Sequence, residues 1–342
     1  MGKPTVHDIA RDAGVSLATV DRVLNGRPGV RQKTVAKVNG AVERLGYVRD
    51  INAANLARQR LYRFVFLLPE GKSQFLSSLE AAVRDAASSL IGHRCEVDVI
   101  RTDFSETSIS KDLMPHLVEV KADGVAVMGD ETQSVRNMIA DLKATGVSVV
   151  ALVTDQSGSE RDHFVGIDNV AAGKTAGVLM GRYLGGRAGR VAVVVNTKQS
   201  RDMVERRMGF DQIMGDQFPV VEVLDSVEGR DDQDQVARVL EDTLDQRGPI
   251  AGIYCAGAGT RGVTRVIRDR ALTDEVVVVA HELTPHCREA LKDGTIDVII
   301  NQNVGHIARS AVRILRAKCD DVAINANQEK IRIEIAIREN LT

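Results

Sequence analysis

The chain has 342 residues, of which 44% are hydrophobic, enough to bury the core of a small domain and of a larger two-part body. The sequence shows no stretch of about 18 apolar residues and no apolar run before a cleavage site, so we expect neither membrane insertion nor export, and the cytoplasm is the default location. The four cysteines are scattered without a CxxC pair and the seven histidines form no metal-spaced cluster, which argues against a zinc site or a disulfide framework.

The net charge of −2 conceals an uneven distribution along the chain. Residues 1–60 carry eleven Lys and Arg against five Asp and Glu, a balance of +6, whereas the remaining residues carry 34 against 42, a balance of −8. Because phosphate neutralisation dominates the affinity of proteins for nucleic acids, a basic head on an acidic body favours a protein that presents one end to a polyanion.

The first fifty residues predict three short helices. Thr5 can cap a helix over residues 7–13 that Gly14 ends, and Ser16 can cap a second helix over residues 17–24, which Asn25 and the following glycine stop. A third helix over residues 34–45, with a glycine just past its end, completes a minimal core. Two helices joined by a tight turn form a helix-turn-helix unit, although any small three-helix bundle shows the same periodicity.

Residues 51–60 form a short segment rich in helix formers that lies between this head and the body. Ten residues are too few to hold a helix in isolation, so the segment is either an ordinary linker or a helix that forms only with a partner.

The body predicts near-continuous apolar strands that alternate with amphipathic helices, which is typical of parallel sheets covered on both faces. This pattern indicates a doubly wound α/β architecture divided into two lobes near residues 158–165, with a final strand over 331–337 that crosses back between them. The expected strands before that one are 64–68, 97–100, 124–127, 149–152, 191–195, 220–224, 250–255, 276–279 and 298–300.

One rival motif points to a different function. Residues Gly257 to Gly262 match GxGxxG, follow an apolar strand and open a helix, and Glu282 lies 20 residues beyond Gly262. That context fits a dinucleotide fingerprint, so an NAD-sensing regulator or a dehydrogenase-like protein is the alternative interpretation. GxSxG, HExxH and P-loop motifs are absent from the sequence, and we expect no enzymatic activity and no cofactor.

The residue sequence of the head is more specific than its periodicity, and this sequence resembles that of the lactose-repressor (LacI) family. The resemblance rests on Val6-His7-Asp8-Ile9-Ala10, Ala13-Gly14-Val15-Ser16, Thr19-Val20, Arg22-Val23-Leu24-Asn25 and Leu45-Gly46-Tyr47. It implies a ligand-responsive regulator of transcription, possessing an all-α helix-turn-helix head and a two-lobed body like the type I periplasmic sugar-binding proteins.

The resemblance also implies how the head meets DNA. Residues 17–25 become the recognition helix in the major groove, with Leu17, Ala18 and Arg22 near base edges, and Arg22 is the expected guanine reader because its guanidinium can donate two hydrogen bonds. Members of the family usually carry Ser where this chain has Asp21, whose carboxylate would repel a phosphate. The other expected DNA-binding residues are Thr5, Ser16, Thr19, Asn25 and Thr34.

In the same family the segment after the head folds on operator DNA and wedges a leucine into the minor groove, and Leu56 holds that place here. This chain has Arg49 where the family commonly has proline, which leaves the bend into the hinge less fixed.

For the body, the resemblance implies a sugar-like effector bound at the carboxyl ends of the strands. Arg206 is the expected charged donor, Phe75 the stacking face, and the remaining expected contacts are Asp155, Asp168, Glu282 and Gln302. The chain departs from the family at residues 256–259, where an Asn-Asp pair is usual, and at His281-Glu282, where an aspartate is usual.

These inferences give a DNA-binding domain over residues 1–50, a hinge over 51–61 and a ligand-binding and dimerisation domain over 62–342. We expect a homodimer, or a tetramer, on a near-palindromic operator of double-stranded DNA, controlled by a small sugar or sugar derivative.

Overall fold

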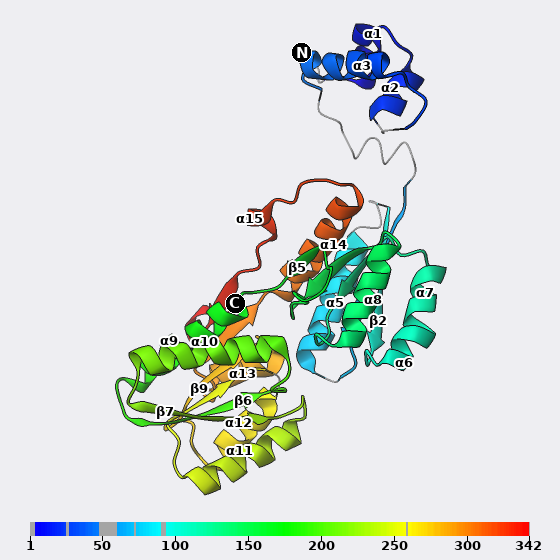
Figure 1. The fold of residues 1–342 in the computed structure, drawn as a ribbon. Coiled ribbons are helices and arrows are strands. Elements are labelled where there is room, and N and C mark those ends of the chain that lie inside the picture. The colour runs from blue at the N-terminus through cyan, green and yellow to red at the C-terminus, as the bar shows by residue number, and fades with distance from the viewer. Residues whose placement is uncertain are drawn as a thin grey trace. The chain divides into compact units, whose positions relative to one another are not determined.

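The computed structural model describes residues 4–24, 27–47, 60–71, 73–89, 94–257 and 259–341. The chain divides into two compact units, Met1–Arg60 and Leu61–Thr342, which we describe separately (Figure 1). Asn25, Leu56 and almost all of the expected hinge lie outside the described residues. Among the described helices, none has both the length and the hydropathy to span a bilayer.

The first unit holds three helices, as the sequence predicts. They are α1 (Val6–Ala13), α2 (Leu17–Leu24) and α3 (Gln32–Leu45). Thr5 caps α1 in a capping box with Asp8, and Gly14 and Gly46 end α1 and α3 at φ values of 63° and 59°, a left-handed conformation that glycine adopts without strain.

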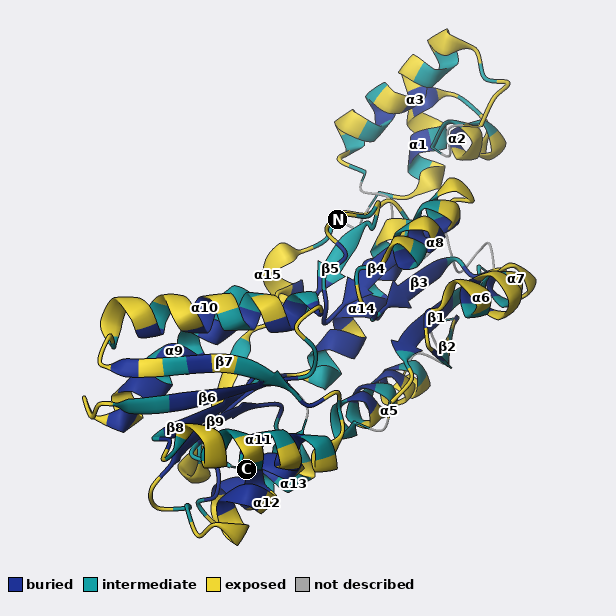
Figure 2. Cartoon of the chain, turned by 60° about the horizontal axis from the view of Figure 1, so that its bottom comes forward, coloured by how far each residue is buried: buried dark blue, intermediate teal, exposed yellow. Residues whose placement is uncertain are grey.

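A small core holds these helices together. Ile9 and Ala13 of α1, Val20 of α2, and Val38 and Ala41 of α3 are buried against one another. Each helix therefore buries one face and leaves the other in solvent, the arrangement that Figure 2 shows in yellow and blue.

The second unit is a two-lobed α/β body. The first lobe is built on a five-stranded parallel sheet in the order β2-β1-β3-β4-β5. Its strands are β1 (Tyr62–Pro69), β2 (Cys95–Thr102), β3 (Gly124–Val127), β4 (Ser148–Leu152) and β5 (His163–Val165). Its helices are α5 (Gln74–Ser89), α6 (Glu106–Ser108), η2 (Ile109–Leu113), α7 (Met114–Glu119) and α8 (Gln133–Ala144).

The second lobe is built on a six-stranded sheet in the order β11-β10-β9-β8-β6-β7. Its strands are β6 (Gly189–Val195), β7 (Val221–Glu228), β8 (Gly252–Cys255), β9 (Val277–His281), β10 (Val298–Gln302) and β11 (Ile333–Ala336), and only β11 runs antiparallel to its neighbour. Its helices are α9 (Asn169–Leu184), α10 (Arg201–Gln217), α11 (Gln233–Arg247), α12 (Thr260–Asp269), α13 (Pro285–Lys292) and η3 (Arg338–Asn340).

The sequence predicts this fold class correctly but misplaces the crossings between lobes. The chain first crosses after β5, which still pairs with β4, so residues 158–165 belong to the first lobe. It crosses back at α14 (Val304–Cys319), which packs against α5, β3 and β4, rather than at the final strand. After α15 (Ala326–Glu329) the chain returns to the second lobe as β11, an edge strand beside β10.

Candidate nucleic-acid interface and ligand cavity

The solvent face of α2 presents the residues expected to read bases. Leu17, Ala18 and Arg22 are exposed, and Leu17 keeps 42% of its accessible surface although it is a large apolar side chain. Val20 is fully buried and holds the opposite face of the helix on the core. The helix therefore offers a small apolar and cationic surface of the size that fits a major groove.

Hydroxyl side chains lie at the start of each helix of the head. Ser16 caps α2, since its hydroxyl accepts a hydrogen bond from the Thr19 amide at 3.2 Å and lies 2.9 Å from the Thr19 hydroxyl. Thr5 is exposed at the start of α1, and Thr34 lies in the first turn of α3. Amide and hydroxyl donors at helix N-termini are suited to phosphate oxygens.

The unusual carboxylate on α2 has a partner. Arg27 Nη1 lies 3.2 Å from Asp21 Oδ2, and both side chains are more than half exposed. The pair offsets the negative charge that would otherwise face a phosphate, which explains how a family position that is usually Ser can carry Asp here.

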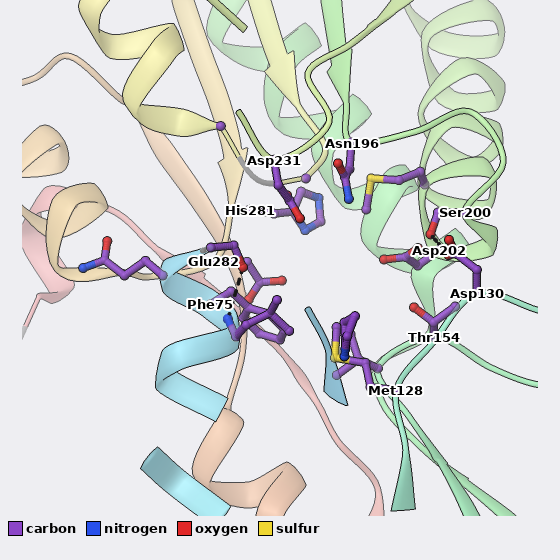
Figure 3. A pocket seen from close by; sticks show the side chains of 18 of the residues that line it. Phe75, Met128, Asp130, Thr154, Asn196, Ser200, Asp202, Asp231, His281 and Glu282 are labelled. Atoms are coloured by element: carbon purple, nitrogen blue, oxygen red, sulfur yellow. Dashed lines mark hydrogen bonds between the residues drawn. The ribbon is translucent and has the colours of Figure 1, made fainter. Parts of the chain in front are cut away.

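The candidate ligand site is a cavity of about 920 Å³ in the body, lined from both lobes. Its walls come from the segments that follow β1, β2, β3, β4, β6, β7, β8 and β9, together with the first turns of α5 and α10. In parallel α/β sheets the carboxyl ends of the strands are where ligands bind, and the cavity of Figure 3 lies there.

Arg206 is the largest fully buried side chain of the body and lines this cavity. Its Nε donates to Asn169 Oδ1 at 2.9 Å and its Nη1 donates to the Ala256 carbonyl at 2.7 Å. The backbone below it is held closely, because a Cβ on Gly173 of α9 would collide with the Arg206 carbonyl oxygen. The guanidinium is therefore fixed in position before any ligand binds.

Glu282 lines the same cavity and lies beside Arg206. Its Oε1 accepts a hydrogen bond from Gln302 Nε2 at 2.8 Å and lies 3.6 Å from Arg206 Nη2, whereas its Oε2 is buried without a partner. Burial raises the pKa of Glu282 to about 7, against the opposing influence of the Arg206 charge and the Gln302 hydrogen bond.

His281 is the last residue of β9 and also lines the cavity. Its Nε2 lies 2.9 Å from the Tyr254 hydroxyl, and its Nδ1 is buried without a partner. Burial and the nearby Arg206 charge hold the pKa of His281 well below its usual value, so the ring is neutral.

Backbone strain gathers around the same cavity. Phe104, Val153, Asp231 and Glu282 line it at positive φ values of 53°, 63°, 56° and 70°. A β-branched residue such as valine rarely adopts this conformation, and strain of this kind concentrates at binding sites.

Three of the six residues expected to contact the ligand, Phe75, Arg206 and Glu282, line the cavity, and the others do not. The Asp155 carboxylate instead pairs with Arg161, whose Nη2 donates to it at 2.7 Å. Asp168 is exposed and caps α9 by accepting from the Ala171 amide at 2.9 Å. Gln302 is buried behind Glu282 and orients it.

Sequence reasoning missed several acidic residues of the cavity, chiefly Asp130, Asp202 and Asp231. Asp130 follows β3 closely, so the strand pattern could have found it. Asp231 was hidden because the apolar run ends at Leu224, whereas β7 continues to Glu228 through residues that are exposed or half-buried (Figure 2). Asp202 lies in the first turn of α10, where the local sequence carries no strand signal.

The glycines of the rival motif are explained by packing. A Cβ on Gly259 or Gly262 would collide with Val236 of α11, and a Cβ on Gly257 would lie 2.9 Å from Met203 Sδ. Close packing against α11 accounts for Gly259 and Gly262, and contact with Met203 of α10 accounts for Gly257, so no dinucleotide is needed to explain the motif.

Comparisons with known families match both units of the chain. Residues 5–50 match the bacterial regulatory proteins of the lacI family, and residues 64–321 match the periplasmic binding protein domain. Among solved structures, the fold resembles a glucose-galactose binding protein from Geobacillus stearothermophilus, with a TM-score of 0.73 at 19% identity over 82% of this chain and 99% of that one. A solute-binding protein from Burkholderia graminis in complex with D-arabinose gives a TM-score of 0.72 at 22% identity over 82% and 96%.

Curated relatives include catabolite control protein A of Staphylococcus epidermidis, 28% identical over 48% of this chain and 47% of the relative. The same protein of Staphylococcus xylosus is 30% identical over 36% of this chain and 37% of the relative. In both cases the match spans less than half of the relative's length. The chain belongs to the periplasmic binding protein domain family over residues 64–321, and residues 5–50 form a helix-turn-helix domain of the lacI family of bacterial regulatory proteins.

Proposed function

We propose that this protein is a repressor of a carbohydrate uptake or catabolism operon, and that a small sugar-like effector in the body controls its affinity for the operator. Residues 1–50 bind DNA, residues 51–61 act as the hinge, and residues 62–342 bind the effector and form a homodimer. The observation that carries the proposal is the pairing of an exposed recognition-helix face with a cavity built around a buried arginine.

The DNA half of the proposal rests on Arg22. Its side chain is exposed on α2 and forms no ion pair with any residue of the described head, so it is available to a guanine edge. Arg11 and Arg44, by contrast, are paired with Asp8 and Asp12.

The effector half rests on Arg206, Glu282 and Phe75. A fixed guanidinium and a carboxylate can together donate to and accept from adjacent hydroxyls, and Phe75 supplies a flat apolar face for C–H groups. Ser200 and Arg201 of the second lobe reach Asp130 and Glu131 of the first at 2.5 and 3.1 Å, so occupation of the cavity can change how the lobes meet.

The test begins with selection of a preferred duplex from a random library, followed by fluorescence anisotropy of labelled DNA. Arg22→Ala should weaken binding to the selected duplex by roughly 1–3 kcal/mol and bind unrelated DNA nearly as before. Arg44→Ala removes the same charge from α3 and is the matched control. Equal losses on selected and unrelated duplexes would contradict the base-reading role of Arg22.

The effector response is then measured on the selected duplex in the presence of sugars, polyols and their phosphates. A coupled ligand should change operator affinity by roughly 5- to 150-fold, downward for an inducer and upward for a corepressor. Binding to the body without any change in operator affinity would remove the regulatory role of the cavity.

A further inference from the structure

The lining of the cavity is far more acidic than recognition of a neutral sugar requires. The described lining residues include eight carboxylates against two guanidinium groups, those of Arg206 and Arg261. Arg206 already contacts Asn169, Ala256 and Glu282, and of the other acidic lining residues Asp234 is paired with Arg265 and Asp232 caps α11.

Three of these carboxylates line the cavity from both lobes. Asp202 and Asp231 come from the second lobe and Asp130 from the first, and none of the three forms an ion pair with a described Lys or Arg (Figure 3). Burial raises the pKa of Asp231, and the charges of Asp202 and Asp130 raise it further. The influence of Asp202 and Asp130 on Asp231 indicates that the three carboxylates lie in one region of the cavity.

Two of the acidic groups also have free acceptor atoms inside the cavity. Asp202 is 8% exposed and Glu282 is 9% exposed, and Oδ1 of the former and Oε2 of the latter are buried with no hydrogen-bond partner. A buried carboxylate oxygen without a donor is costly, so the natural occupant has to supply donors at these positions.

From this geometry we propose that the effector is a polyhydroxylated amine, such as an amino sugar or an amino polyol, whose ammonium group lies among Asp130, Asp202 and Asp231. The inference rests on the proposed function, since it names the class of effector for that same cavity. Within the described residues, no group of three or more His, Cys, Asp or Glu side chains is arranged to hold a metal ion, so the occupant inferred is an organic cation.

The hydroxyl-bearing part of this effector follows from the rest of the lining. Asn196, Thr154 and Ser200 surround the acidic groups with amide and hydroxyl partners, and Phe75 and Met128 provide apolar faces (Figure 3). A polyamine without hydroxyls would leave these amide and hydroxyl groups without hydrogen-bond partners. A neutral sugar would leave the charges of the three aspartates unbalanced.

The ammonium group also has a mechanical consequence. Because Asp130 lies on one lobe and Asp202 and Asp231 on the other, bringing the lobes together brings like charges together. A cation between them converts that repulsion into attraction, so the charged ligand favours a closed arrangement that its neutral parent does not.

Isothermal titration of the full-length protein at neutral pH tests this. The probes are glucosamine, galactosamine and mannosamine, each compared with its parent hexose and with its N-acetyl derivative, which keeps the nitrogen but loses the charge. We expect at least one amine to bind roughly 10- to 100-fold more tightly than both of its uncharged relatives, the range of a charge-assisted hydrogen bond.

Asp202→Asn and Asp231→Asn should each reduce that preference to within a few-fold, and having two separate variants guards against one that fails to fold. Asp225→Asn removes an exposed carboxylate of β7 outside the cavity lining and should keep the preference. If parent hexoses bind as tightly as their amines, if none of the amines binds, or if spermidine or calcium binds more tightly than the amines, the inference is wrong. The proposed function fails separately, on the loss of operator preference or of any effector response.

Discussion

Replacing Arg206 by Met should produce a stability loss that depends on pH in a specific way. The substitution keeps the apolar stem but removes the cation 3.6 Å from Glu282, together with the donors to Asn169 and Ala256. Leaving a buried charge without its partner typically costs 3–5 kcal/mol. We expect a loss of about that size in the free energy of unfolding above neutral pH, where Glu282 is ionised.

The pH dependence follows from the pKa of Glu282, which is about 7 in the folded protein and 4.5 as the ordinary value. An acid whose folded pKa is raised contributes stability that is present below its unfolded pKa and lost as the pH rises through its folded pKa. In the wild type the stability contributed by Glu282 stops falling near pH 7, its folded pKa. Without the Arg206 charge the folded pKa rises further, so the variant continues to lose stability above pH 7, by about 1.4 kcal/mol for each unit of additional pKa.

Urea unfolding measured at several pH values on both sides of neutrality checks this. Because the chain has no tryptophan, the transition is followed by far-ultraviolet circular dichroism. In the double variant Arg206→Met with Glu282→Gln, the additional fall in the free energy of unfolding above pH 7 should disappear. Arg182→Met, which replaces an exposed arginine of α9, is the matched control. A difference between variant and wild type that stays constant from acid to alkaline pH would refute the assignment to Glu282.

Three further substitutions probe the two units. Gly173→Ala should lower the free energy of unfolding of the body by about 1–3 kcal/mol, because the new Cβ collides with the backbone of α10. Gly215→Ala on α10 is the control: its Cβ meets nothing within 4 Å, so the same urea titration should find it neutral or mildly stabilising. Val20→Ala should destabilise the head by about 2 kcal/mol and abolish operator binding by anisotropy, and an unchanged affinity would contradict its core role. Arg27→Ala should weaken operator binding by leaving Asp21 uncompensated, and adding Asp21→Ser should restore part of it; failure of that rescue would show that Arg27 acts on DNA directly.

Much of the fold was predictable because its elements follow local rules. The three head helices, the glycines that end the first and third, and the caps at Thr5 and Ser16 follow from propensity and capping, and the structure confirms them. The central strands are continuous apolar runs and were placed to within a few residues. The sequence pattern did not predict β5, which is only three residues long, or the second half of β7, which contains no fully buried residue.

The cavity was harder to predict because a carboxylate at a strand end has several possible partners. Asp155 and Asp168 follow strands as the ligand residues do, yet one pairs with Arg161 and the other caps α9. Only the three-dimensional structure decides which side chain turns inward. Asn169, one residue beyond Asp168, is the one that reaches Arg206.

The close crossing of α9 and α10 affects how a signal can leave the cavity. Backbone touches backbone where Gly173 and Gly209 meet the opposing helix, and such a joint has no side chains that could slide or repack. A force applied to the Arg206 guanidinium is therefore passed to both helices at once. For the proposed function, we therefore expect effector binding to move α9 and α10 together as one rigid pair.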